Sequence, residues 1–325
     1  MENGKFVISL DFELLWGMRD IENYSAYEEN IVGVHTVIPR LLETFTTYDV
    51  KATFAIVGFL FFENKDQLIH DLPSRLPGYT NQKLSPYRHF DVVKESADID
   101  LLHFAPKLIK LIQQYPSQEI GTHTFSHYYC LEAGQSVAEF EADLQHAQKI
   151  AGENNIPLYS LVFPRNQFQQ DYLDVCSKLG ITSYRGNERS WMYEARNGDA
   201  ENFARRALRL LDSYVNISGH NCYPDDFIKS SFPRNIPASR FLRPYEKGLE
   251  AFDKIKLDRI TSGMTYAAKK KMTYHLWWHP HNFGINQDKN FSFLEQILSH
   301  YTKLNARYNF QSYTMSALVN LLDNG

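Results

Sequence analysis

The alternation of short and long apolar segments constrains the fold of this chain more than any other feature. Short runs rich in β-branched and aromatic residues, such as 6–10 and 273–278, are separated by longer stretches. In one of these stretches, 137–154, apolar side chains recur every three or four residues, which is the period of an amphipathic helix. Strands that alternate with helices favour βα units and a mainly parallel sheet. We therefore expect an α/β fold.

Strand character is found in seven segments: 6–10, 51–57, 119–122, 158–163, 183–185, 214–218 and 273–278. Helix character is found in seven longer segments and a short last one: 34–48, 101–115, 137–154, 169–179, 199–211, 245–268, 291–306 and 316–322. About seven βα units predict a distorted (β/α)7-type barrel, and an open doubly wound sheet is the competing arrangement. Two proline-rich stretches, 71–100 and 218–244, are expected to be long loop insertions.

Charge and composition exclude several classes of protein. The 325 residues have a formal net charge of -4, so the chain lacks the basic surplus typical of nucleic-acid binding. No apolar run approaches the about 18 residues of a membrane span, and the N-terminus lacks the features of a signal peptide. Three widely spaced cysteines, Cys130, Cys176 and Cys222, suit a reducing compartment. We expect a cytoplasmic protein with one domain over residues 1–325 and leave its oligomeric state open.

Four polar segments stand at the ends of apolar runs. They are Asp11-Phe12-Glu13, His123-Thr124-Phe125-Ser126-His127, Phe163-Pro164-Arg165-Asn166-Gln167 and His279-Pro280-His281-Asn282. The ends of parallel strands meet on one face of an α/β barrel, where loops gather reactive groups. These segments are therefore the candidate active site.

Metal binding is the chemistry that the first two segments favour. His123 and His127 are four residues apart, a spacing that in one helical turn places both imidazoles on one face. Asp11 and Glu13 are two apart on a strand and should point to the same side. One carboxylate can complete a two-histidine site for a divalent ion, and the other can accept a proton from water. The pattern leaves open which carboxylate does which.

The remaining segments offer a proton donor and cationic side chains. An imidazole at His279 can protonate a leaving group. Arg165 and Arg185 can each orient a carboxylate bidentately, or can form an ordinary surface ion pair. His275 lies inside a strand and is expected to be a core histidine. The chain has no Gly-x-Ser-x-Gly elbow, P-loop or Gly-x-Gly-x-x-Gly motif for serine-hydrolase, NTPase or dinucleotide chemistry.

Over about residues 6–322 the chain resembles the polysaccharide deacetylase superfamily, also called the NodB-homology or carbohydrate esterase family 4-like superfamily. Segment 9–13 resembles its first motif, His123 and His127 match the spacing of its second, and Trp278-His279-Pro280 resembles its last. Two departures stand out. A gapless alignment places the second aspartate of the first motif on Phe12, so Asp11 and Glu13 could exchange roles. In segment 163–167 proline precedes arginine, the reverse of the family order.

The resemblance implies a distorted barrel of the metal-dependent amide hydrolases, and it implies residue roles. It implies that Asp11 is the general base and that His279 is the general acid. It also implies an arginine that orients the base, for which Arg165 is the first candidate and Arg185 the other. It gives the metal ligands as Glu13, His123 and His127. We place Arg185, Trp278 and His281 at the substrate.

The implied function is hydrolysis that removes an N-acetyl or N-formyl group from an amino sugar. The implied cofactor is a divalent metal ion, for which we expect Zn²⁺. The cytoplasmic address points to a surface-glycan precursor as the substrate. Two alternatives stay open: a cyclic-amide hydrolase resembling the allantoinase branch, and a catalytically silent glycan-binding module. The sugar and the acyl group are not determined by the sequence.

Overall fold

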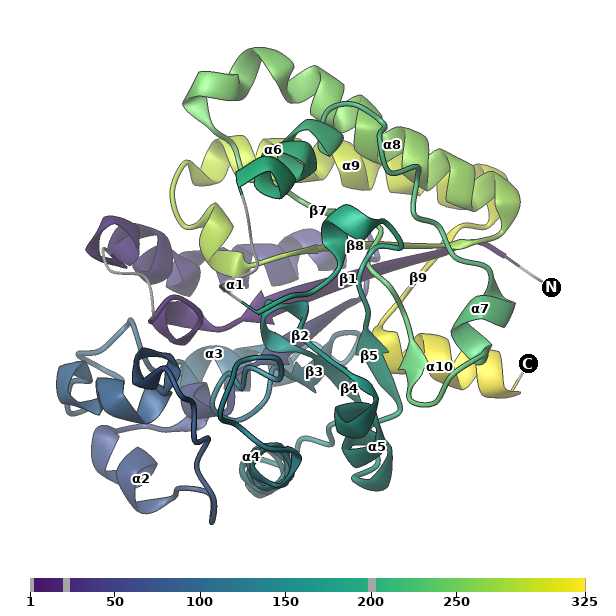
Figure 1. The fold of residues 1–325 in the computed structure, drawn as a ribbon. Coiled ribbons are helices and arrows are strands. Elements are labelled where there is room, and N and C mark those ends of the chain that lie inside the picture. The colour runs from purple at the N-terminus through teal and green to yellow at the C-terminus, as the bar shows by residue number, and fades with distance from the viewer. Residues whose placement is uncertain (1–2, 20–23, 198–202, 325) are drawn as a thin grey trace.

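Strand β1 (Lys5–Phe12) lies in the middle of a parallel sheet. The computed structural model describes residues 3–19, 24–197 and 203–324. In it, β1 pairs in parallel with β2 (Ala52–Ile56) on one side and β8 (Thr273–Trp278) on the other (Figure 1). Every residue of β1 is buried, because helices cover one face and the barrel interior covers the other.

On one side of β1 the strands follow in chain order from β2 to β6, and on the other side lie β8 and then β7. The order of the sheet is β6-β5-β4-β3-β2-β1-β8-β7, and β9 (Gln311–Tyr313) adds to the start of β1. The other strands are β3 (Glu119–Thr122), β4 (Ser160–Val162), β5 (Ser183–Arg185), β6 (Arg234–Asn235) and β7 (Arg240–Phe241).

This arrangement confirms the predicted distorted (β/α)7-type barrel with a mainly parallel sheet. Each of its ladders is parallel. A doubly wound sheet would reverse its strand order at an internal point, and this sheet has no such reversal. Among the described residues no ladder joins β7 to β6, so the sheet is a curled half-barrel.

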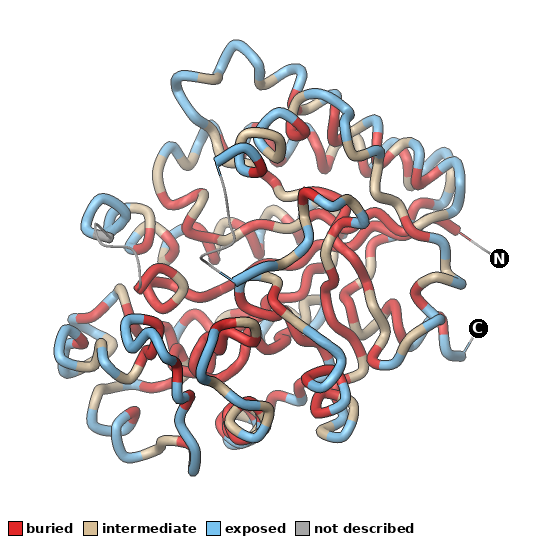
Figure 2. Tube along the Cα trace, viewed as in Figure 1, coloured by how far each residue is buried: buried red, intermediate tan, exposed pale blue. Residues whose placement is uncertain are grey.

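Helices pack around the outside of the sheet (Figure 1), and the buried backbone concentrates in the strands between them (Figure 2). The longer helices are α1 (Glu28–Thr47), α4 (Val137–Glu153), α8 (Asp253–Lys270) and α9 (Gln287–Tyr308). The shorter ones are α2 (Lys65–His70), α3 (Pro106–Gln113), α5 (Gln170–Lys178), α6 (Phe203–Asp212), α7 (Asp225–Lys229) and α10 (Met315–Asn324). No described helix combines the length and the apolar character needed to cross a membrane.

Most predicted elements are confirmed within a few residues, and the strand predicted at 214–218 is wrong. These residues form turns after α6. Asp212, the last residue of that helix, accepts hydrogen bonds from the backbone N–H groups of Ile217 (2.9 Å) and Ser218 (2.8 Å). The carboxylate thereby satisfies donors that a strand would have offered to a neighbour. The predicted helix at 199–211 begins outside the described residues and continues as α6.

The stretch 218–244 is more than the loop insertion expected from its prolines. It contains helix α7 and the two-residue strands β6 and β7, which form both edges of the sheet. Such short strands leave no periodic signal in a sequence. The stretch 71–100 is loop with two short 3₁₀ segments, Gln82–Leu84 and Pro86–Val92, as its lack of period predicts.

Candidate active site

The C-terminal ends of strands β1, β3 and β8 bring the predicted polar residues together. Asp11 is the second-last residue of β1, and Glu13 follows that strand directly. His123 follows β3, and His279 follows β8. Since the three strands are parallel, their ends lie at one edge of the sheet, where active sites of barrels are built.

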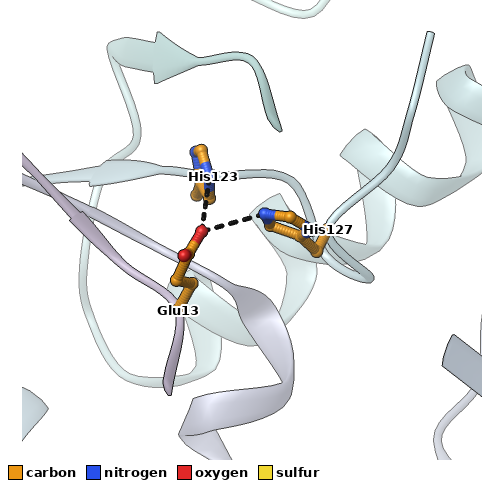
Figure 3. Close-up of side chains that lie close together, drawn as sticks. All are labelled: Glu13, His123 and His127. Atoms are coloured by element: carbon orange, nitrogen blue, oxygen red, sulfur yellow. Dashed lines mark hydrogen bonds and ion pairs between the residues drawn. The ribbon is translucent and has the colours of Figure 1, made fainter. Parts of the chain in front are cut away.

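Glu13, His123 and His127 form a compact buried cluster (Figure 3). Glu13 Oε2 lies 2.9 Å from His127 Nε2 and 3.3 Å from His123 Nε2. The pKa of Glu13 is well below its usual value: burial raises it, but His279 and the two clustered imidazoles outweigh the burial. Glu13 is therefore an anion between two imidazoles.

The two histidines are brought together by a loop, not by the helical turn considered from the sequence. Thr124 (φ 65°) and His127 (φ 58°) adopt left-handed backbone conformations that fold the segment back on itself. Asp143 of α4 accepts hydrogen bonds from the backbone N–H groups of Phe125 (2.7 Å) and Ser126 (3.2 Å) and from the Ser126 hydroxyl. Sequence reasoning missed Asp143, since nothing in the motif points to an acid on the next helix.

The hydrogen bonds of the two imidazoles decide which nitrogen carries the proton. His123 Nδ1 is 2.8 Å from the Val162 carbonyl, which can only accept, so His123 Nε2 presents a lone pair toward Glu13. Arg19 Nη1 donates to His127 Nδ1 at 3.0 Å, so the neutral His127 carries its proton on Nε2. Burial lowers the pKa of His127 to about 3. Arg19 is a second residue that sequence reasoning missed.

The donor set fits a divalent metal ion. A carboxylate oxygen and two imidazole nitrogens, all within 4.8 Å of one another, are the ligands that Zn²⁺ takes in catalytic sites. The carbonyl behind His123 is the kind of outer partner that orients a ligating histidine. One contact opposes the fit, because His127 can ligate through Nε2 only if its proton moves to Nδ1 and the Arg19 contact opens.

Asp11 is held by a buried arginine. Arg185 Nη1 lies 2.6 Å from Asp11 Oδ1, and Nη2 lies 2.7 Å from Oδ2. The same guanidinium donates to Ser9 Oγ (3.0 Å) and Asn166 Oδ1 (2.9 Å), and it stacks 4.0 Å over the ring of Trp277. Burial raises the pKa of Asp11, but Arg185, together with His123 and His279, outweighs burial and leaves the pKa lowered.

The structure corrects the choice between the two arginines. Arg165, which we placed beside the base, pairs instead with Glu132 (3.1 Å) and stacks 4.1 Å over Tyr129. It lies in a turn in which its own backbone is left-handed (φ 54°). Arg185 is the last residue of β5, and its side chain reaches into the barrel toward Asp11.

His279 and His281 lie on the other side of Glu13. His279 Nε2 is 3.7 Å from Asp11 Oδ2 and 3.6 Å from Glu13 Oε1, which is too long for hydrogen bonds. Its side chain is 24% exposed, so it can meet a ligand. His281 Nδ1 is 4.0 Å from Glu13 Oε1, and burial lowers the pKa of His281 to about 4.

Trp278, which we placed at the substrate, is fully buried in the core instead. Successive side chains of a strand point to opposite faces, so the register of β8 sends Trp278 toward Phe45 of α1 and Trp277 toward the barrel opening. His275 is the core histidine that we expected: Nδ1 donates to the Ile236 carbonyl (2.9 Å), and Nε2 accepts from Ser9 Oγ (2.9 Å).

A cavity of about 780 Å³ opens beside this cluster. Its lining includes Arg165, Asn166, Phe241, Trp277 and His279. Its volume is in the range of small-molecule sites. A ligand in the cavity therefore meets His279, whose Nε2 lies 3.6 Å from Glu13 Oε1 of the cluster.

Comparison with known proteins confirms the predicted resemblance. The family model described as "Polysaccharide deacetylase" matches residues 29–184. The match contains His123, His127 and Arg165, whereas Asp11 and Glu13 precede it and His279 follows it. Among curated proteins, no sequence matches this chain.

Solved structures share the fold at low sequence identity. A Mycobacterium smegmatis protein assigned as a polysaccharide deacetylase has 11% identity and a TM-score of 0.62, covering 100% of this chain and 92% of its own. A 4-alpha-glucanotransferase from Thermococcus litoralis has 10% identity and a TM-score of 0.50, with 98% and 40% covered.

Proposed function

We propose that this chain, whose residues 29–184 match the polysaccharide deacetylases, is a hydrolase that removes an N-acetyl or N-formyl group from an amino sugar. The observation that carries the proposal is the buried cluster of Glu13, His123 and His127 beside the Asp11–Arg185 pair. Asp11 can serve as the base, and the partly exposed imidazole of His279 beside it can serve as the acid.

Glu13, His123 and His127 would hold a divalent ion, for which we expect Zn²⁺. When bound, such an ion supplies Lewis-acid activation of a carbonyl and of water. The other residues have roles of their own.

Asp11 accepts the proton of the attacking water. Arg185 occupies one lone pair on each carboxylate oxygen and keeps the group ionised, and Oδ2 is the oxygen that faces His279. The new bond joins the water oxygen to the acyl carbon.

His279 donates a proton to the leaving nitrogen as the amide C–N bond breaks. Its Nε2 lies on the cavity side of both carboxylates. Asn282 Oδ1 lies 3.3 Å from His279 Nδ1 and favours one ring orientation. The products are a carboxylic acid and a free amine.

The substrate class follows from the cavity. Trp277 and Phe241, with ring centroids 4.7 Å apart, form an apolar wall against which a sugar ring can pack. An acylated amino sugar presents both such a ring and an amide. We propose a precursor of a surface glycan as the natural substrate, processed in the cytoplasm.

A second function, a catalytically silent glycan-binding module, is favoured by one observation. Arg19 holds His127 in the tautomer that cannot ligate through Nε2. A chain that no longer bound metal could keep that contact at no cost to function.

Acetate or formate release from a panel of N-acylated amino sugars, with Zn²⁺ added, tests the proposal. The hydrolase releases acid with at least one substrate, and His123→Ala abolishes the release. His70→Ala, which changes an exposed histidine of α2, leaves it unchanged. Sugar binding with no acid release from any substrate would favour the silent module.

A further inference from the structure

The cavity beside the cluster is rich in positive charge, although the chain as a whole is acidic. Among the described residues its lining contains six arginines and three glutamates, an excess of three positive charges within that set, in a chain of net charge -4. The arginines are Arg165, Arg196, Arg206, Arg209, Arg240 and Arg243, and the glutamates are Glu132, Glu188 and Glu194. A concentration of one sign of charge around a concave site raises the local concentration of the opposite ion.

Two of the glutamates pair with arginines of the same lining. Glu132 pairs with Arg165 at 3.1 Å, and Glu194 lies 3.8 Å from Arg196. The third, Glu188, is buried, and burial raises its pKa, which disfavours its negative charge. The four other arginines of the lining are Arg206, Arg209, Arg240 and Arg243; we call these four residues the arginine wall.

The charge of Arg240 is only partly offset by Asp212, because that carboxylate is shared with a second arginine. Asp212 forms an ion pair with Arg240 and a second one with Arg259 at 3.4 Å. One carboxylate thus faces two guanidinium groups, and the local sum stays positive.

Arg209 and Arg243 bring like charges close together. Burial lowers the pKa of Arg243, and the charge of Arg209 lowers it further. Arg243 Nε donates to Ser213 Oγ at 2.7 Å, which holds the guanidinium in place. Arg206 precedes Arg209 by three residues on α6, and both side chains line the cavity. Like charges held together on one wall are stabilised by an anion between them.

We propose that the arginine wall binds a phosphate group of the substrate, either a phosphomonoester or a diphosphate attached to the acylated sugar. Planar guanidinium forks match phosphate oxygens bidentately and stay charged at every physiological pH. The wall shares one cavity with Trp277 and His279, so a sugar bound against Trp277 places its attached phosphate within the same space. This inference rests on the proposed function for the identity of the sugar.

Isothermal titration calorimetry with pyrophosphate and metal-stripped protein tests whether the arginine wall binds phosphate, without requiring catalysis. Wild type binds pyrophosphate saturably, and the affinity falls as salt rises. Arg206→Ala and Arg243→Ala each weaken it at least tenfold. Arg307→Ala, which changes an exposed arginine of α9, leaves it unchanged.

Two further variants and two further probes keep the result interpretable. Arg206→Lys and Arg243→Lys keep the charge but lose the fork, so they bind with intermediate affinity. Thermal melts of all variants separate lost binding from lost folding. Competition by uridine diphosphate and by geranyl diphosphate tells a nucleotide-linked from a lipid-linked source, because the compound that resembles the natural substrate displaces pyrophosphate at the lower concentration.

The inference is overturned if wild type binds no pyrophosphate, or if Arg206→Ala and Arg243→Ala remain folded and bind it as wild type does. The failure of the hydrolase proposal is a different result. In that case pyrophosphate still binds to the wall while no N-acylated sugar, phosphorylated or free, releases acid.

Discussion

Arg185 donates hydrogen bonds to both carboxylate oxygens of Asp11, at 2.6 Å and 2.7 Å, and both side chains are buried. The two residues are 174 positions apart in the sequence, and strands β2, β3 and β4 lie between the two strands that carry them. A bidentate, charge-assisted pair of this kind holds a carboxylate ionised and fixes its orientation.

Replacing Arg185 by lysine should change the pH dependence of hydrolysis. The lysine cannot fork across both oxygens, so the pKa of Asp11, which Arg185 now lowers, rises. The acidic limb of the profile of kcat/KM against pH shifts to higher pH, and kcat falls by about 10²-fold. Arg165→Lys, which changes an arginine that does not contact Asp11, leaves the acidic limb in place. An unchanged acidic limb in Arg185→Lys would remove Asp11 from the role of base.

Removing the charge of Arg19 should tighten metal binding. In Arg19→Met, His127 is free to move its proton from Nε2 to Nδ1, and a cation next to the site is gone. We expect the affinity for Zn²⁺ to rise by about tenfold, measured against a competing chelator. Weaker binding in a folded Arg19→Met protein would show that Arg19 supports the metal-bound arrangement.

Asp143 should matter for stability and for activity together. Asp143→Ala leaves the buried N–H groups of Phe125 and Ser126 without their acceptor, at a cost of about 1–3 kcal/mol each. Urea unfolding should show a loss of a few kcal/mol, and hydrolysis should fall because the loop positions His123 and His127. Glu141→Ala on the same helix, which removes only the partner of Lys178, is the control. Full activity in Asp143→Ala would mean that the loop holds its shape without the acid.

Stability should fall on acidification partly because of His275. Burial lowers its pKa to about 3, whereas the unfolded chain has its ordinary value of 6.5. Below pH 6.5 His275 binds a proton in the unfolded state but not in the folded state. Its contribution to the free energy of unfolding is therefore lost as pH falls from 6.5 toward 3.

His275→Gln removes this difference in proton binding between the folded and unfolded states. The free energy of unfolding of this variant should depend less steeply on pH, by up to about 1.4 kcal/mol per pH unit below 6.5. The measurement is urea unfolding of both proteins between pH 4 and pH 8. Parallel curves would show that His275 does not titrate differently in the two states.

The sequence was sufficient for the order of elements and for the edge of the sheet where polar residues gather. Both follow from local period and from the convergence of parallel strand ends. It did not reveal Asp143 or Arg19, since each acts through a hydrogen bond that only the folded chain creates. Trp278 was misplaced because a continuous buried run does not tell which side chains face the barrel opening.

The choice between Arg165 and Arg185 also lay beyond the sequence. Both residues stand at the ends of apolar runs, and the decisive difference is the left-handed turn at Arg165. That conformation is uncommon outside glycine, asparagine and aspartate, so it could not be predicted for an arginine.

Anomalous diffraction at the zinc edge, from crystals grown with Zn²⁺, tests most directly whether Glu13, His123 and His127 share one ion. We predict a single strong peak about 2.0–2.2 Å from a Glu13 oxygen and from Nε2 of both histidines. The Arg19 contact to His127 should be broken in that crystal. A crystal in which zinc binds elsewhere, while Glu13 keeps its hydrogen bond to His127, would contradict the metal site.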